Sequence, residues 1–151
     1  MWNSRRLVLA HLWFAFACFG AALLLGEWQM LVRSPLHAWI SDPEWYYRSV
    51  TAHGTTMAYV FPTLVAMGFG YFATEAALKR PLIGLHWAWL GFVLVALGTV
   101  TAIVPVALGR ASVLYTFYPP LIGHPLYYIG VVLVVVGSWV WVALMSVNLY
   151  R

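Results

Sequence analysis

Four long apolar runs constrain this chain more than any other feature of its sequence. They cover about residues 7–32, 46–77, 82–108 and 126–148. A helix needs about 20 predominantly apolar residues to cross the hydrocarbon core of a bilayer, where it satisfies its own backbone hydrogen bonds. Only 8% of the residues are charged, whereas a typical soluble domain carries about 25%. The sequence therefore predicts an all-α membrane protein, with a single membrane domain of four transmembrane helices over residues 1–151.

The basic residues between the runs predict how the helices are oriented. Cytoplasmic loops of membrane proteins are enriched in lysine and arginine. One side of the predicted bundle holds Arg5, Arg6, Lys79, Arg80 and Arg151, and the other holds Arg33, Arg48 and Arg110. We therefore expect both termini to be cytoplasmic. The net charge of +4 is interpreted as a sign of topology and not of nucleic-acid binding, because the basic residues form no stripe.

Two prolines predict local features of the second helix. Ser41 or Asp42 is expected to cap its first turn, with Pro43 at the first helical position. Pro62 lies well inside the same run and has no N–H to donate to the carbonyl of Ala58. We therefore expect a kink at Pro62.

One histidine, His53, lies inside the second run, about 10 Å below its predicted outer end by helical rise. Ionisable side chains at membrane depth are costly and by default indicate function. A neutral imidazole is also a good ligand for haem iron. A buried histidine that hydrogen-bonds a neighbouring helix would fit the same residues, and this pattern alone leaves both interpretations open.

Helical periodicity predicts which residues would surround a haem on His53. Ser49, Val50 and Met57 lie three or four positions away and share its face, and Gly54 adjoins it. These four residues are the predicted walls of a haem pocket. Gly68 and Gly70 are better explained by close packing of helices. The lone cysteine, Cys18, belongs to no haem-attachment motif, so any haem would be held without covalent bonds.

The remaining histidines offer a weaker alternative. His11 and His86 share a depth near the predicted cytoplasmic side and would clamp a haem if they faced each other, although interfacial histidines that bond headgroups or water explain them more simply. His37 and His124 fall in outer connections and are expected to be solvated. Glu27 and Glu75 lie near helix ends and not at the midplane, where a proton pump or ion carrier would usually place an acid.

Two motifs resemble a known family. The stretch Thr51–Met57 (TAHGTTM), followed by Met67–Tyr71 (MGFGY), resembles the second span of subunit I of the haem–copper oxygen reductases. The stretch Ala111–Leu121 (ASVLYTFYPPL) resembles the outer connection between the third and fourth spans of that family, and is closest to its B-type branch. Residues 26–35 fit the same branch. The resemblance covers essentially the whole chain.

The resemblance implies specific roles. His53 would be an axial ligand of a b-type low-spin haem, and Tyr118, Pro119 and Pro120 would have a structural role at the outer face. The other low-spin ligand, the high-spin haem ligand and the copper ligands belong to later spans, which this chain does not contain. The implied partners are the remaining spans of subunit I, a copper-bearing subunit II and cytochrome c, in a prokaryotic cytoplasmic membrane.

Three functions follow from these observations. The first is the N-terminal part of the catalytic subunit of a cytochrome c oxidase, as a split subunit or a truncated product. Without the binuclear centre this chain alone cannot reduce oxygen. The second is a free-standing four-helix cytochrome b that carries electrons, and the third is a haem-free remnant or assembly factor.

Overall fold

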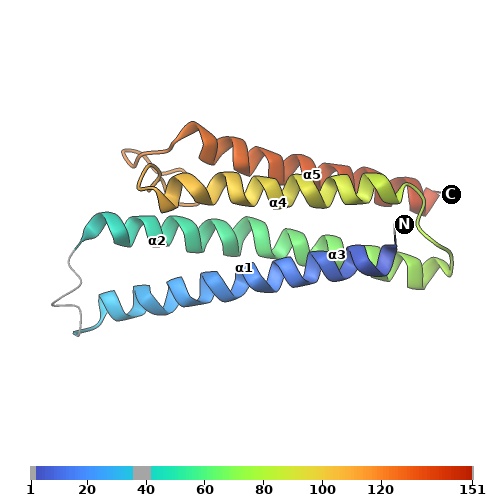
Figure 1. Cartoon of the computed structure of the whole chain (residues 1–151), viewed down its shortest axis with the longest axis horizontal. Coiled ribbons are helices and arrows are strands. Elements are labelled where there is room, and N and C mark those ends of the chain that lie inside the picture. Colours follow the sequence, from blue (N-terminus) through green and yellow to red (C-terminus); the bar gives the residue numbers. More distant parts are fainter. Residues whose placement is uncertain (1–2, 36–41, 151) are drawn as a thin grey trace.

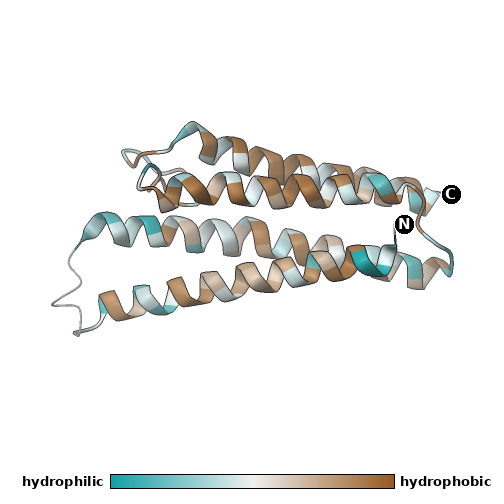
Figure 2. Cartoon of the chain, in the orientation of Figure 1, coloured by the Kyte–Doolittle hydropathy of each residue, from teal (hydrophilic) through white to brown (hydrophobic). Residues whose placement is uncertain are grey.

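A computed structural model describes residues 3–35 and 42–150, which form a bundle of antiparallel helices (Figure 1). The elements in order are α1 (Ser4–Arg33), α2 (Pro43–Thr55), the π-helical turn η2 (Thr56–Val60), α3 (Phe61–Leu78), α4 (Leu85–Ala107) and α5 (Pro125–Tyr150). Because α2, η2 and α3 run on without a break, the described residues form four helices long and apolar enough to cross a membrane. The predicted all-α fold of four membrane helices is confirmed. Hydrophobic residues dominate α4 and α5, whereas α2 is largely hydrophilic to neutral in colour (Figure 2).

The first two helices begin at side-chain caps. The side chain of Asn3 accepts a hydrogen bond from the Arg5 amide, 2.8 Å away, so α1 starts before the apolar run. Asp42 accepts from the Glu44 amide at 2.9 Å, and Pro43 occupies the first turn of α2. The predicted start of the second helix is thereby confirmed with Asp42 as its cap. Ser41 and His37 lie outside the described residues.

Pro62 is accommodated by the π turn η2. With no N–H at residue 62, the regular ladder cannot continue through the Ala58 carbonyl. The Phe61 amide instead donates to the carbonyl of Thr56, five residues back, and the backbone stays in the right-handed helical region. The sequence predicted a kink at Pro62, and the structure shows a π turn on the N-terminal side of the proline. Such turns are rare and often occur at functional sites.

The helices pack in two layers, with α1 beside α2 and α3, and α4 beside α5 (Figure 1). Glycines bring α4 and α5 together, because a Cβ on Gly98 would lie 2.6 Å from the carbonyl oxygen of Gly130. Gly68 lies under His11 of α1 and Gly70 under Trp141 of α5, which confirms helix packing as their role. Close backbone approach at small residues is the usual way for membrane helices to associate.

Asn148 joins the end of α5 to the turn before α4. Its side-chain amide donates to the carbonyls of Ile83 and Leu144 and accepts from the Ile83 amide at 3.0 Å, and its own carbonyl accepts from Arg80. The residue is only 4% exposed. Both ends of the described chain lie at this end of the bundle (Figure 1).

At the opposite end, Arg48 ties α2 to α4. Its guanidinium donates to the carbonyls of Val106 (2.9 Å) and Ala107 and lies 4.1 Å from the ring centroid of Trp45. The last carbonyls of a helix have no partner within it, and they attract cations.

We expect Arg48→Met to lower the free energy of unfolding by about 1 kcal/mol, because the final carbonyls of α4 lose charged donors at a partly solvated site. Thermal unfolding in detergent measures this. Arg110→Met is the matched control, since Arg110 is exposed near the same helix end. Equal melting temperatures for the two variants would contradict the capping role.

Candidate functional site

His53 lies on α2 with its imidazole against α1. Its Nδ1 is 2.8 Å from the backbone carbonyl oxygen of Ala22, a residue that is itself buried. A carbonyl can only accept, so the ring must carry its proton on Nδ1 and donate it to Ala22. In a neutral imidazole Nε2 then bears a lone pair, and it makes no hydrogen bond within residues 3–35 and 42–150.

Gly26 provides the space for this ring. A Cβ at position 26 would lie 3.1 Å from Cε1 and 3.3 Å from Nδ1 of His53. Ala22 and Gly26 are one turn apart on α1, so one face of that helix supplies both the hydrogen-bond acceptor and the gap. The imidazole is half-buried. The Ala22 carbonyl and the backbone of Gly26 set its position on α1.

The predicted pocket residues divide among different faces of α2. Val50 and Met57 share the His53 face and are half-buried. Ser49 is buried, donates to the Tyr46 carbonyl, and lines a cavity of about 520 Å³ between α1, α2 and α4. Gly54 lies beneath the ring of Tyr115, whose Cγ would be 2.9 Å from an added Cβ. Val50 and Met57 therefore stay predicted pocket residues by their helical positions alone, whereas Ser49 lines this cavity and Gly54 packs against Tyr115.

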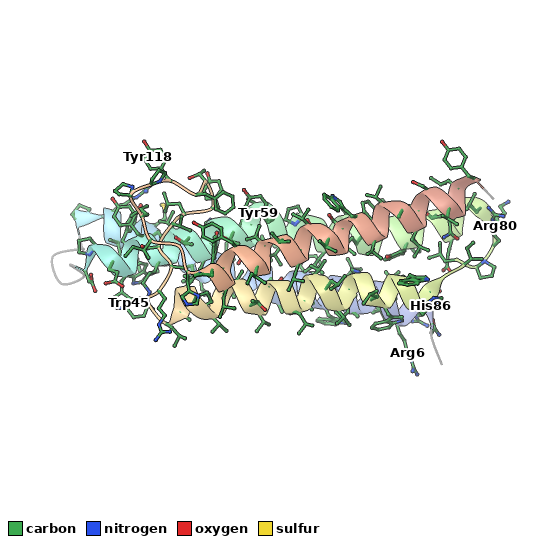
Figure 3. The ribbon with its side chains drawn as sticks, turned by 90° about the horizontal axis from the view of Figure 1, so that it is seen from above. Arg6, Trp45, Tyr59, Arg80, His86 and Tyr118 are labelled. Carbon is green, nitrogen blue, oxygen red and sulfur yellow. The ribbon has the colours of Figure 1, made fainter. Side chains whose placement is uncertain are left out.

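The other faces of α2 and η2 hold the connection between α4 and α5. Thr51 accepts from the Leu114 amide at 3.0 Å, and Thr55 and the Tyr127 hydroxyl are hydrogen-bonded at 2.6 Å. Tyr59 donates to the Tyr115 carbonyl at 2.9 Å. Tyr118 projects from this connection at the end that also holds Trp45 (Figure 3). These bonds hold α2 in place around its histidine.

The structure does not pair His11 with His86. His11 is fully buried, donates from Nδ1 to the Leu7 carbonyl, and packs against the rings of Tyr71 and Phe92. His86 is exposed at the end of the bundle and lies beside Trp87 (Figure 3). A haem held between the two histidines therefore finds no support in this arrangement. Among the described residues, no three His, Cys, Asp or Glu side chains gather as they would around a metal ion.

Comparison with known proteins identifies the family. The model of the family cytochrome c and quinol oxidase polypeptide I matches residues 6–151. The chain belongs to this family. Over 98 residues it is 40% identical to cytochrome c oxidase subunit 1 of Thermus thermophilus. The aligned region covers 63% of this chain and 17% of that protein.

A solved structure shares the fold. It is a haem–copper terminal oxidase dimer determined by cryo-electron microscopy, with a TM-score of 0.83 and 33% identity over 91% of this chain and 24% of the solved one. The chain thus spans about a fifth of the length of these oxidase polypeptides. Together with its four apolar helices, the family membership establishes a multi-pass membrane protein.

Ala22 and Gly26 are the residues of the candidate site that sequence reasoning missed. A signal for them was present, because small residues four apart on a membrane helix indicate a face for close contact. That signal does not say which residue makes the contact. His53 as the partner emerges only from the packing of α2 on α1.

Proposed function

We propose that this protein is the N-terminal part of the catalytic subunit of a cytochrome c oxidase of the B-type branch, in which His53 supplies one axial ligand of the b-type low-spin haem. The observation that carries the proposal is the hydrogen bond from His53 Nδ1 to the Ala22 carbonyl. A histidine that ligates a metal usually donates a hydrogen bond from its other ring N–H to such an acceptor. This bond fixes the tautomer and raises the basicity of the ligating nitrogen.

The residues around His53 fit the requirements of a haem ligand. Nε2 is left with its lone pair, the ring is seated against Gly26, and the half-buried Val50 and Met57 offer apolar contacts on the same face. When bound, the haem supplies one-electron transfer, and the protein tunes it through axial basicity, burial and nearby hydrogen bonds. The chain's own contribution is to hold the imidazole at a fixed angle, with its Nδ1–H directed at the Ala22 carbonyl.

The second low-spin ligand, the high-spin haem and the copper would be held by further spans of the subunit. A copper-bearing subunit II and cytochrome c would deliver electrons at the outer face, in the cytoplasmic membrane of a prokaryote and with the termini of this chain on the cytoplasmic side. The likeness to a bacterial cytochrome c oxidase subunit 1 and to a haem–copper oxidase supports this assignment.

The test is a reduced-minus-oxidised absorbance spectrum of the protein purified with its natural membrane partners. We expect His53→Ala to lose the low-spin b-type band, and we expect His11→Ala and His86→Ala, as matched histidine controls, to retain it. An unchanged six-coordinate band in His53→Ala would overturn the proposal. Loss of the band in the His11 or His86 variant would favour a four-helix cytochrome b instead.

A further inference from the structure

A long groove runs between α1 and α4, with α2 and η2 as its floor. One part of it is the cavity of about 520 Å³ that Ser49 lines, and the other part is a cavity of about 330 Å³. Phe14 lines the far end of the second part, where its ring packs against Phe92 of α4 at a centroid distance of 6.2 Å. We call the two parts together the apolar groove. They adjoin, because four residues line both of them: Leu25, Ala52, Ile103 and Ala107.

The walls of the apolar groove offer a ligand almost only hydrocarbon. Of the hydroxyls in its lining, Ser49 and Thr99 already donate to backbone carbonyls of their own helices, at 2.7 and 2.8 Å. Among the described residues, no carboxylate and no histidine lines either part. Val100 and Val104 in the α4 wall are 56% and 44% exposed, so the groove is open along its side. A ligand that fills it must present apolar surface along most of its length.

One end of the apolar groove is different. Arg48 is the single charged side chain among the described residues of the lining, and Trp28 and Trp45 border the same cavity. Two nitrogens of the Arg48 guanidinium donate to carbonyls at the end of α4, which leaves N–H groups for another acceptor. Glu44 and Arg48 each lie 3.3 Å from a Cβ added at Gly109, so this carboxylate offsets part of the positive charge. The end therefore favours a ligand with hydrogen-bond-accepting oxygens and does not require a net negative charge.

This polar end lies at one end of the bundle. Trp45 belongs to the first turn of α2, and Ala107 is the last residue of α4. Figure 3 shows Trp45 at the end opposite Arg80 and His86. Tryptophan is enriched where a membrane span meets the headgroups. From there the groove follows α1 and α4, each long and apolar enough to cross a membrane, so the rest of its length lies along the hydrocarbon.

The dimensions of the groove favour one hydrocarbon chain over a helix. From Phe14 to Trp28 the α1 wall is about 21 Å long by helical rise, and half of the hydrocarbon core of a bilayer is about 15 Å. The second part extends over about 16 Å between Phe14 and Leu25, so its mean cross-section is about 20 Å². A helix with its side chains is about 10 Å across and would need about 80 Å².

We infer that one acyl chain of a membrane phospholipid occupies the apolar groove, while the ester and phosphate oxygens of that lipid accept hydrogen bonds from Arg48. The chain runs from the two tryptophans toward Phe14. This inference does not depend on haem ligation by His53.

Photolabelling tests this in the protein purified with its natural membrane partners and returned to a bilayer. Two phosphatidylcholines carry a diazirine, one beside the glycerol and the other near the end of one acyl chain. We expect the first lipid to label peptides around Trp28 and Trp45. We expect the second to label peptides around Phe14 and Thr99, as identified by mass spectrometry of the digest.

Filling the groove is expected to abolish this labelling. The double variant Ala21→Phe, Val104→Phe adds a ring to each wall of the second part. The double variant Ala17→Phe, Val93→Phe is the matched control and should keep the pattern, because its positions lie on the same two helices outside both linings. All four positions are exposed, Val93 at 43% against 44% for Val104. Unchanged elution from a sizing column verifies that both variants fold.

Four results would contradict the inference. Labelling spread evenly over the exposed helix faces would show that the acyl chain has no fixed position. An undiminished pattern in the filled variant would place the lipid elsewhere. Absence of labelling in the groove would show that another helix covers it. An isoprenoid quinone in the lipid extract, lost from the filled variant, would identify a quinone site instead.

Discussion

Gly26→Val is expected to remove the low-spin haem band as completely as loss of His53 itself, although the histidine remains. A Cβ at position 26 already lies 3.1 Å from Cε1 of His53, and the branched methyls of valine would extend further into the ring. The imidazole must then rotate away from α1, which breaks its bond to the Ala22 carbonyl and moves Nε2. Reduced-minus-oxidised spectra and haem content per protein measure the effect, and we expect occupancy to fall at least about tenfold, a cost of about 1.4 kcal/mol.

Gly20→Val is the matched control on the same helix, because an added Cβ at Gly20 meets no heavy atom within 4 Å. Gly26→Ala is the graded variant, in which the ring needs to shift by only a few tenths of an ångström. We expect Gly26→Ala to keep its haem with an altered midpoint potential. Full occupancy and an unaltered potential in Gly26→Val would show that α1 does not set the position of the imidazole.

Gly130→Leu is expected to separate α4 from α5 and to unfold the second layer of the bundle. An added Cβ at position 130 would lie 2.5 Å from the Gly98 carbonyl oxygen and 2.7 Å from the Ala102 side chain. The first of these obstacles is backbone, which cannot rotate aside as a side chain can. Overpacking of this kind typically costs about 1–3 kcal/mol, and a clash with backbone belongs at the upper end of that range.

Thermal unfolding in detergent measures this loss. Val132→Leu is the control on α5, because Val132 is 57% exposed and tolerates a longer side chain. A melting temperature for Gly130→Leu within error of this control would show that the glycine contact between α4 and α5 does not hold the layer together.

The fold could be predicted largely from physical necessity. A bilayer leaves few ways to satisfy a backbone inside it, so four apolar runs required four helices, and Asp42-Pro43 set the start of one of them. The type of turn at Pro62 could not be read, because a missing N–H predicts an interruption without choosing how the ladder reforms. The role of Asn148 was also overlooked, since its partner Ile83 is 65 residues away in the turn before α4.

The candidate site was only partly predictable. Depth and chemistry singled out His53, but periodicity could not say which flank of its helix meets α1. Ser49 shares the predicted face of His53 and yet lines the cavity toward α4. Gly54 follows His53 directly, and a step of one residue turns a helix by about 100°, which carries Gly54 round to Tyr115. The sequence around His53 does not identify its neighbours on another helix, such as Ala22.

The π turn at Thr56–Val60 lets one continuous helix meet α1 with two differently phased halves. Its wider winding takes in an additional residue, which offsets the phase of α3 by roughly one residue, or about 100°. Before the turn, His53 hydrogen-bonds the Ala22 carbonyl of α1, and after it, Gly68 packs against His11 of α1. Deleting a single residue in this turn would rotate the His53 imidazole about the helix axis while α3 stayed packed against α1. The length of the second span at this point is therefore as constrained as the identity of any side chain in it.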